Sequence, residues 1–212
     1  VATLGRIADQ TLADWEWVFG VNFWGVLHGI RAFLPKLQSA GRPAHIVNTA
    51  SLAGLVDGPM LAPYFVSKHA VVSLSECLDL ELQAESSPIG VSVLCPGFVR
   101  TSIMDSSRNR SGGPSEAEQL QRSGASQLDQ LMRFGITTGM DPSEVADKVF
   151  SAVCHGRFWV LPHDGSGERV RSVAARSYGD QNPELTPIAQ QAGIAEPGPS
   201  PVGAGAATRS GQ

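Results

Sequence analysis

Three side chains in the first third of the sequence have the types and spacing that proton-transfer chemistry requires. Tyr64 and Lys68 are four residues apart in a segment predicted to be helical, so they lie on one helix face. A phenol with a pKa near 10 is a poor acid–base catalyst at neutral pH, but a nearby ammonium group lowers that pKa. Ser51, thirteen residues before Tyr64, offers a hydroxyl that can hold a substrate oxygen beside the phenol. We therefore expect a site that exchanges a proton with this oxygen.

Proton exchange on oxygen is useful when a hydride moves on the attached carbon. No side chain donates a hydride, so this chemistry requires a nicotinamide cofactor, NAD or NADP. The predicted reaction is the interconversion of a secondary alcohol and a ketone. Taken without their neighbours, Tyr64 and Lys68 would instead be an ordinary amphipathic pair on a helix. A hydrolase that uses Ser51 as nucleophile is excluded, because its GxSxG turn needs glycine at position 49, which is Thr49.

The elements that must position these residues follow from the apolar pattern of the chain. Apolar residues spaced by three and four predict helices, and short β-branched runs predict strands. The predicted helices cover 11–40, 63–85, 141–154 and, more weakly, 168–178; the predicted strands cover 45–49, 91–95 and 158–161. Alternating strands and helices predict an α/β protein with a parallel sheet. Ser51 follows the first strand, and ligands of such sheets bind beyond the carboxyl ends of the strands.

Two segments differ in composition from the rest of the chain. Residues 98–139 are polar and rich in Ser, Arg and Gly, and such a long excursion from a compact domain usually forms a functional loop or lid. In the tail 193–212, 14 of the 20 residues are Gly, Pro, Ala or Ser. We expect this tail to be disordered.

The overall composition excludes several classes of protein. Sixteen basic and 20 acidic residues give a net charge of −4 over 212 residues, so nucleic acid is not an expected partner. No apolar run approaches the roughly 20 residues needed to span a membrane. Three scattered cysteines without a CxxC pair, and five histidines without HExxH spacing, predict neither a disulfide scaffold nor a metal site. We expect a cytoplasmic protein.

Five features, taken together and in order, resemble the short-chain dehydrogenase/reductase family. Residues 64–68 (YFVSK) match its YxxxK signature, and the separation of Ser51 from Tyr64 is usual for the family. Residues 21–25 (VNFWG) resemble its Asn-bearing helix, residues 46–51 (IVNTAS) its IVNxSS strand, and residues 96–101 (PGFVRT) its nicotinamide-side loop. The resemblance covers residues 1–162.

The resemblance implies a role for each matching residue. Tyr64 would be the general acid/base, and Lys68 would lower its pKa and contact the nicotinamide ribose. Ser51 would orient the substrate oxygen, and Asn22 would hold a water molecule of the proton relay. The loop would bind the nicotinamide end of the cofactor through four residues: Pro96, Gly97, Val99 and Thr101, with backbone contacts from Val99 and a side-chain contact from Thr101.

Some of these residues have alternative interpretations. Asn22 would otherwise be a buried structural amide, and Thr101 would otherwise cap the next helix. Asn48 is expected to be a structural hydrogen-bonding residue at the strand end. The arginines between Arg100 and Arg133 are expected to be solvated, with contact to an anionic substrate as the alternative.

The resemblance also implies an architecture. Residues 1–162 would form the C-terminal part of a doubly wound, Rossmann-type parallel sheet, with 98–139 as the substrate lobe, and residues 163–192 would be a C-terminal extension. The helices at 11–40 and 63–85 would form the interface of a homodimer or homotetramer. The family's glycine-rich TGxxxGxG turn and NNAG segment are not in the sequence, so we expect a fragment whose first strand has an unpaired edge. The second hypothesis is therefore an inactive fragment that acts as a dimerising or binding module.

Overall fold

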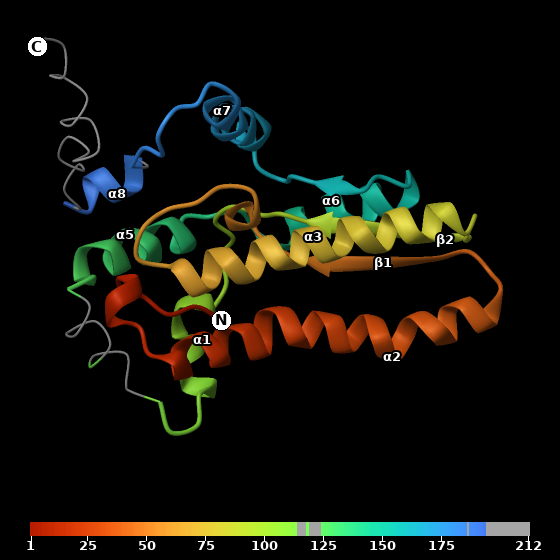
Figure 1. The fold of residues 1–212 in the computed structure, drawn as a ribbon, viewed down its shortest axis with the longest axis horizontal. Helices are drawn as coiled ribbons and strands as arrows, with labels where there is room; N and C mark the ends of the chain where they lie inside the picture. The colour runs from red at the N-terminus through yellow and green to blue at the C-terminus, as the bar shows by residue number, and fades with distance from the viewer. Residues whose placement is uncertain (114–117, 119–123, 186, 194–212) are drawn as a thin grey trace, which may run out of the picture.

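The computed structural model describes residues 1–113, 118, 124–185 and 187–193. Three parallel strands, helices on both sides of them and several short helical turns make up these residues (Figure 1). The elements in chain order are η1 (Ile7–Asp9), α1 (Leu12–Phe19), η2 (Gly20–Trp24), α2 (Gly25–Ala40), β1 (Ala44–Thr49), η3 (Leu52–Gly54), α3 (Ala62–Ala84), β2 (Ile89–Leu94), η4 (Ile103–Asn109), α5 (Ser126–Thr137), α6 (Pro142–Cys154), β3 (Trp159–Val160), α7 (Ser166–Tyr178) and α8 (Pro187–Gln191).

The sheet has the order β1-β2-β3, and both pairs of strands are parallel. Ala44 is opposite Ile89 at the start of the first pair, and Val93 is opposite Trp159 in the second. The central strand β2 is buried along most of its length, whereas β1 is half-buried and leaves Val47 37% exposed. The predicted parallel α/β sheet is confirmed, and β1 is its edge strand within the described residues.

Alternation along β2 divides the core into two layers. Val91 and Val93 face α3, where they pack in clusters with Leu78 and Val71, and α2 adds Ile30 to the same layer. Leu94 faces the opposite side and packs on α6. The helices α2 and α3 therefore cover one face of the sheet, and α6 covers the other (Figure 1).

The first predicted helix is interrupted where the candidate residue Asn22 occurs. Thr11 and Asp14 form the predicted capping box, in which each side chain accepts a hydrogen bond from the other's backbone N–H. The chain then passes through the π-helical turn η2 before α2 begins at Gly25, and Gly41 in the left-handed conformation follows the end of α2 at Ala40. Such π-turns often mark functional positions because they redirect side chains out of the helical register.

The remaining predicted elements occur close to their expected positions. Asp141 caps α6 by accepting a hydrogen bond from the backbone of Ser143, and Pro63 lies in the first turn of α3. The excursion 98–139 contains η4 and α5, whereas the tail predicted to be disordered lies outside the described residues from 194 onward. None of the helices in the described ranges is long and apolar enough to cross a membrane.

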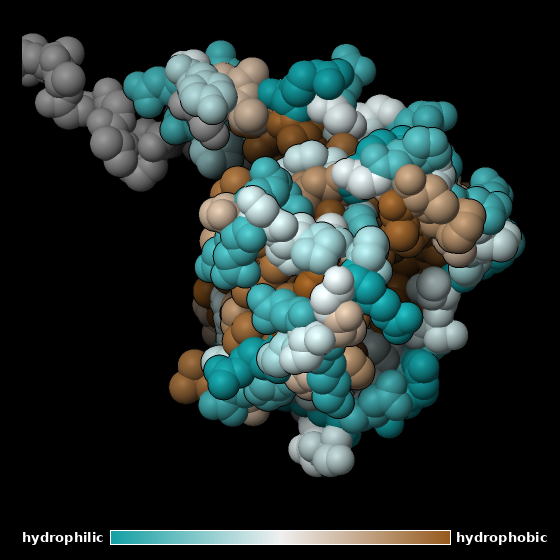
Figure 2. Space-filling model, turned by 90° about the vertical axis from the view of Figure 1, so that its right-hand side faces the viewer, coloured by the Kyte–Doolittle hydropathy of each residue, from teal (hydrophilic) through white to brown (hydrophobic). Residues whose placement is uncertain are grey.

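Figure 2 shows the end of the molecule at which α2 and α3 finish. Hydrophilic residues cover most of this face, and hydrophobic residues are visible in a recess between them. Tyr64 and Lys68 lie in the first two turns of α3, which begins at the opposite end (Figure 1). The candidate site is therefore remote from this face.

Candidate active site

The loops that follow the three strands lie together, because the strands are parallel and their carboxyl ends share one edge of the sheet. The backbone ladder continues beyond β1 and β2, where Leu52 N donates to the carbonyl oxygen of Pro96 at 2.8 Å. Cys95 N donates to the carbonyl oxygen of Val160 at 2.9 Å, which aligns the ends of β2 and β3. This edge is where open parallel sheets bind their ligands.

Ser51, Tyr64 and Lys68 are brought together at this edge, as the sequence predicts. Ser51 is 8% exposed, and its hydroxyl accepts a hydrogen bond from Ala53 N at 3.1 Å and lies near enough to the Tyr64 phenol to affect the pKa of that phenol. Lys68 Nζ lies 5.8 Å from the centre of the Tyr64 ring. The ammonium group donates to the carbonyl oxygen of Thr49 at 3.0 Å. One hydroxyl, one phenol and one ammonium group thus converge.

The pKa of Tyr64 moves in the direction opposite to our expectation. Burial raises the pKa of the phenol above 10, and the nearby Ser51 hydroxyl opposes this rise only in part. Burial also lowers the pKa of Lys68 to about 8, against the effect of the neighbouring Cys95 thiol. The net pKa of Tyr64 is therefore raised, because desolvation of the phenol is the largest effect, and a lowering of this pKa by Lys68 stays a prediction. The Tyr64 phenol is protonated at neutral pH.

The lowered pKa of Lys68 predicts that stability rises with pH in a defined window. Unfolding returns the amine to its ordinary pKa of 10.5, so the unfolded chain binds more protons than the folded chain above about pH 8. We expect the free energy of unfolding to increase from pH 8 to pH 9.5, and Lys68→Met to remove that increase. Urea unfolding at four pH values measures this; an equal slope in both proteins would contradict the prediction.

Asn22 is buried inside the turn η2 and is connected to the first turns of α3. Its Nδ2 donates to Ser67 Oγ at 3.0 Å, and the Ser67 hydroxyl donates to the backbone carbonyl of Tyr64 at 2.8 Å. The same amide also donates to the carbonyl oxygen of Val1 at 2.9 Å. These contacts are those of a buried structural amide, and the role of holding a water molecule stays a prediction. Asn48 is also structural, because its amide donates to Ser75 Oγ.

The segment after β2 leaves the backbone N–H and C=O of Val99 directed away from its bridge partner. Val99 forms a parallel bridge with Met140, in which the bonds are made by Arg100 N and by the carbonyl of Phe98, both to the Met140 backbone. The N–H and C=O of Val99 itself therefore point away from Met140, and neither has a hydrogen-bond partner within the described ranges. A carboxamide offers the matching acceptor and donor.

The other loop residues named from the sequence occupy different environments. Pro96 and Gly97 are half-buried, and the Pro96 carbonyl accepts a long bond of 3.4 Å from the Ser51 hydroxyl. Thr101 is exposed. It does not cap the next helix, since Ser102 occupies the cap position of η4 and makes no side-chain cap bond. The alternative interpretation of Thr101 is therefore wrong.

Gly54 permits the close approach of the loop after Ser51 to α3. A methyl group on Gly54 would lie 2.7 Å from the carbonyl oxygen of Lys68 and 2.9 Å from a Val72 methyl group. We expect Gly54→Ala to lower the free energy of unfolding by about 1–3 kcal/mol, because helix backbone must move to relieve the overlap. Gly29→Ala in α2 is the control, since its new methyl group meets nothing within 4 Å. Equal urea midpoints for the two variants would contradict this explanation.

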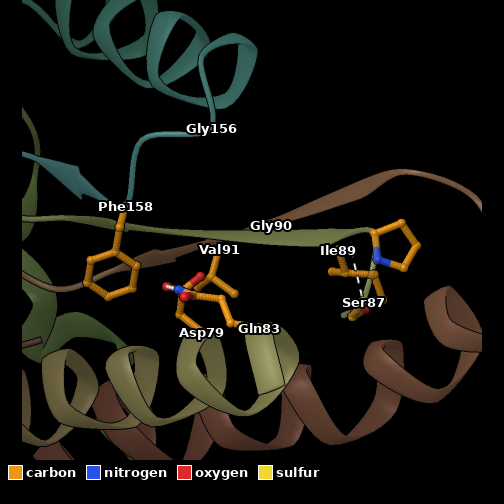
Figure 3. Close-up of a pocket in the computed structure, with 9 residues that line it drawn as sticks. Asp79, Gln83, Ser87, Ile89, Gly90, Val91, Gly156 and Phe158 are labelled. Atoms are coloured by element: carbon orange, nitrogen blue, oxygen red, sulfur yellow. Dashed lines mark hydrogen bonds between the residues drawn. The ribbon is translucent and has the colours of Figure 1, made fainter. Parts of the chain in front are cut away.

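A pocket of about 400 Å³ lies at the opposite end of the sheet from Ser51. Asp79 and Gln83 of α3 line it together with Val91 and Phe158, and Gln83 Nε2 donates to Asp79 Oδ2 at 2.6 Å (Figure 3). Ile89 N donates to Ser87 Oγ at the other end of the pocket. Its lining contains none of the residues that converge at the carboxyl edge, so this pocket is separate from the candidate site.

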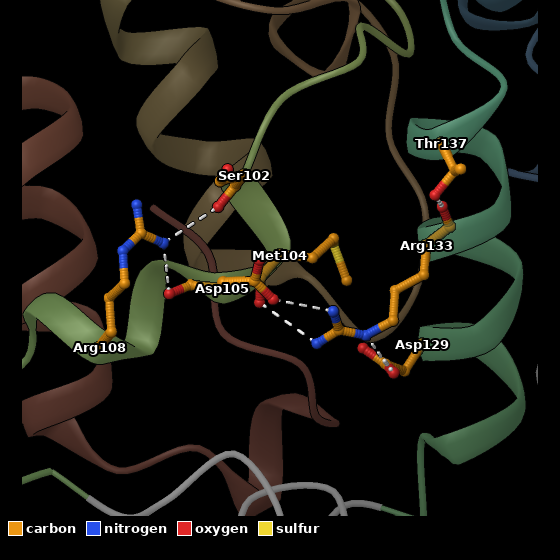
Figure 4. Close-up of polar contacts among 7 residues, drawn as sticks. All are labelled: Ser102, Met104, Asp105, Arg108, Asp129, Arg133 and Thr137. Carbon is orange, nitrogen blue, oxygen red and sulfur yellow. Dashed lines mark hydrogen bonds and ion pairs between the residues drawn. The ribbon is translucent and has the colours of Figure 1, made fainter.

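The described arginines of the excursion pair with acidic side chains or backbone carbonyls of the same chain. Arg133 of α5 contacts Asp129 at 2.9 Å and Asp105 of η4 at 3.0 Å (Figure 4). Arg108 donates to the backbone carbonyl of Asp105 at 2.7 Å, and Arg110 forms an ion pair with Asp14 in which both side chains are under 10% exposed. The expectation that these arginines are solvated is wrong for Arg110. Local contacts fix η4 against α5.

Two residues of this region carried no signal in our sequence interpretation. His163 accepts a hydrogen bond from Gly97 N and donates one to the Phe98 carbonyl. Its position just after β3 matches the positions of Ser51 after β1 and Pro96 after β2, and this pattern could have identified it. Arg110 is 96 residues from Asp14, and no spacing rule connects the two.

Comparison with known proteins agrees with the geometry. The sequence profile described as short chain dehydrogenase matches residues 1–112, which is more than half of the chain. A dehydrogenase/reductase of CLA biosynthesis from Lactiplantibacillus plantarum is 30% identical over 87% of this chain and 65% of its own length. A C alpha-dehydrogenase from a Sphingobium species is 32% identical over 77% of this chain and 52% of its own length.

Solved structures give the same result. A short chain dehydrogenase/reductase from Burkholderia phymatum, solved in complex with NAD, is 36% identical with a TM-score of 0.78. The alignment covers 86% of this chain and 65% of that protein. The chain thus spans about half to two thirds of the length of these relatives. The matched profile, the Rossmann-type neighbours and the arrangement of Ser51, Tyr64 and Lys68 lead to one conclusion: the chain belongs to the short-chain dehydrogenase/reductase family.

Proposed function

We propose that this chain forms the catalytic part of an NAD- or NADP-dependent oxidoreductase that interconverts a secondary alcohol and a ketone. The observation that carries the proposal is the convergence of Ser51, Tyr64 and Lys68 at the carboxyl edge of a parallel sheet. The dehydrogenase names of the relatives and the NAD in the Burkholderia phymatum structure support it.

Each residue then has a role that its contacts support. The cofactor, when bound, supplies or accepts the hydride. Tyr64 passes its phenolic proton to the ketone oxygen, and Ser51 orients that oxygen through its hydroxyl. The Tyr64 phenol carries its proton at neutral pH, which is the form that a general acid for ketone reduction requires. Lys68 is near enough to stabilise the phenolate that remains.

The nicotinamide end of the cofactor has candidate partners on two elements. The backbone N–H and C=O of Val99 would bind the carboxamide, and the Lys68 ammonium would contact the ribose. Pro96 and Gly97 shape the backbone on the same side, and Thr101 offers an exposed hydroxyl next to it. Asn22 orients the first turns of α3 through Ser67.

A homodimer or homotetramer is the assembly that we propose for this protein. Large apolar side chains are exposed on the helices that the family resemblance assigns to an interface: Leu12, Trp24, Phe33, Val66 and Leu80, each 46–80% exposed. An interface between copies of the chain would remove these apolar side chains from water. The three cysteines are all free, which fits a reducing compartment such as the cytoplasm.

Titration with NADH and NADPH, followed by quenching of tryptophan fluorescence, tests the cofactor assignment. We expect binding in the micromolar range, about 8 kcal/mol, and competition by reduced nicotinamide mononucleotide, because the residues present face the nicotinamide end. Preference for one dinucleotide would also distinguish NAD from NADP. A folded chain that binds neither dinucleotide at millimolar concentration would contradict the proposal for this chain.

The second candidate function is a dimerising or binding module without activity. The observation that favours it is the open edge of β1, which presents unpaired backbone groups within the described residues. Under this alternative the chain would form a concentration-dependent complex with a full-length relative and would not bind either dinucleotide. Sedimentation of the mixture, run beside the fluorescence titration, separates the two functions.

A further inference from the structure

His163 lies just beyond β3, and its imidazole ring contacts the loop that follows β2. The backbone N–H of Gly97 donates to His163 Nδ1 at 3.1 Å. On the other side of the ring, Nε2 lies 2.8 Å from the carbonyl oxygen of Phe98. The ring thus bridges two successive residues of the loop through both of its nitrogens.

This bridge specifies the protonation state of the ring. A carbonyl oxygen only accepts hydrogen bonds, so Nε2 must carry a proton. A backbone N–H only donates, so Nδ1 must be unprotonated. The contacts therefore require the neutral imidazole in its Nε2–H form, and no other side chain offers this acceptor and donor at the same separation.

The glycine at position 97 lets the ring lie directly on the loop backbone. A Cβ at this position would lie 3.4 Å from two carbons of the His163 ring. The next residue, Phe98, is held from a second direction, because its carbonyl also accepts a hydrogen bond from Met140 N at 3.0 Å. The carbonyl oxygen of Phe98 thus accepts two hydrogen bonds, one from His163 and one from Met140.

This arrangement determines the orientation of the Val99 backbone. Its orientation follows from the fixed carbonyl of Phe98 on one side and the bond from Arg100 N to Met140 on the other. With both neighbours held, the N–H and C=O of Val99 have one available direction, away from Met140. Release of Gly97 and Phe98 from His163 would leave Met140 alone to maintain that direction.

We propose that His163 is a positioning residue that holds Gly97 and Phe98 so that the Val99 backbone can receive the nicotinamide carboxamide. The inference rests on the proposed function and extends it to a residue outside the family motifs. His163 acts through the loop, and it is assigned no contact with substrate or cofactor. It also connects the segment after β3 to the site, although the sequence boundary predicted at residue 162 separates them.

Three substitutions separate the two hydrogen bonds of the ring. His163→Asn places an acceptor near the former position of Nδ1. His163→Gln places a donor near the former position of Nε2, and His163→Leu provides neither. Amide hydrogen exchange at Gly97 is measured in each variant by NMR, together with the Kd for NADH. His155→Leu is the control, because His155 is exposed at the end of α6 and, within the described residues, its hydrogen bonds go to α6.

We expect Gly97 exchange to be about tenfold faster in His163→Leu and His163→Gln, and nearly unchanged in His163→Asn, since only Asn retains an acceptor. The Kd for NADH should rise about tenfold in His163→Leu, with recovery in His163→Asn and no change in His155→Leu. If His163 acted through packing alone, His163→Asn and His163→Gln would have similar Gly97 exchange rates and similar Kd values for NADH. Equal exchange in all variants, or an unchanged Kd in His163→Leu, would overturn the proposal.

The two readouts also separate this proposal from the proposed function. If the unaltered chain binds no NADH, the cofactor assignment fails, and the part of our inference that concerns the carboxamide fails with it. Gly97 exchange then still decides whether His163 holds the loop. If the chain binds NADH and His163→Leu binds it equally well, the proposed function stands and the positioning role is wrong.

Discussion

Replacement of Tyr64 by Phe should lower kcat by about 10²–10⁴ in any form of the protein that reduces a ketone to a secondary alcohol. The substitution removes the phenolic oxygen and leaves the ring, so the proton donor disappears while the packing stays. Ser51 can still hold the substrate oxygen, but its hydroxyl has no nearby base to replenish a proton. We therefore expect the KM for the cofactor to change little, since Lys68 and the Val99 backbone are intact.

The chain offers a matched control for this experiment, because it has a second tyrosine. Tyr178 in α7 is 92% exposed, and Tyr178→Phe removes the same atom far from the site's contacts. Initial rates with a panel of ketones, measured by the loss of NADH absorbance, compare the two variants with the unaltered chain. Full activity of Tyr64→Phe would show that the proton comes from another group, and equal losses in both variants would indicate a general effect on folding.

The sequence predicted the sheet and the site for reasons of local physics. Buried β-branched runs separated by amphipathic helices specify a parallel sheet, and parallel strands must end at one edge. Ser51 and Tyr64 could therefore be placed near each other without any knowledge of tertiary contacts. The cap of the first helix was equally predictable, because Thr11 and Asp14 interact within one turn.

Other features depend on contacts that local patterns do not encode. One such feature is the direction in which the pKa of Tyr64 shifts. It depends both on how deeply the fold buries the phenol and on how far the phenol lies from Lys68. The π-turn around Asn22 is another, since the apolar spacing of residues 11–40 is that of a continuous helix. His163 and the Asp14–Arg110 pair join segments more than 60 residues apart. For these residues only the folded chain shows the partner.

The Asp14–Arg110 ion pair should contribute strongly to the free energy of unfolding, because it connects the excursion 98–139 to α1. Both side chains are under 10% exposed, Arg110 lies 5.1 Å from the centre of the Trp17 ring, and Asp14 also closes the capping box of α1. Arg110→Met would leave the Asp14 carboxylate buried with hydrogen bonds from Thr11 alone. We expect the free energy of unfolding to fall by about 3–5 kcal/mol, as for other buried pairs that lose one partner.

The pair Arg6–Asp9 provides the control, because it has the same chemistry on the surface. The Arg6 side chain is 70% exposed, so Arg6→Met should shift the urea midpoint far less than Arg110→Met. The double variant Asp14→Asn with Arg110→Met should recover part of the loss, since no charge is then left buried. If Arg110→Met and Arg6→Met have equal midpoints, the buried pair does not hold the lobe to α1.

The Asp14–Arg110 pair also makes the free energy of unfolding depend on pH, in a direction that follows from the pKa of Asp14. Burial acts to raise the pKa of Asp14, but the hydrogen bonds from Arg110 and Thr11 outweigh it and the net pKa is lowered. The stabilisation is therefore complete above the ordinary pKa of an aspartate and is lost as the pH falls through the lowered value. The difference between the unaltered chain and Arg110→Met should shrink on acidification. A difference that stays constant with pH would mean that the Arg110 side chain stabilises the fold through its contact with Trp17, with the charge of Asp14 contributing nothing.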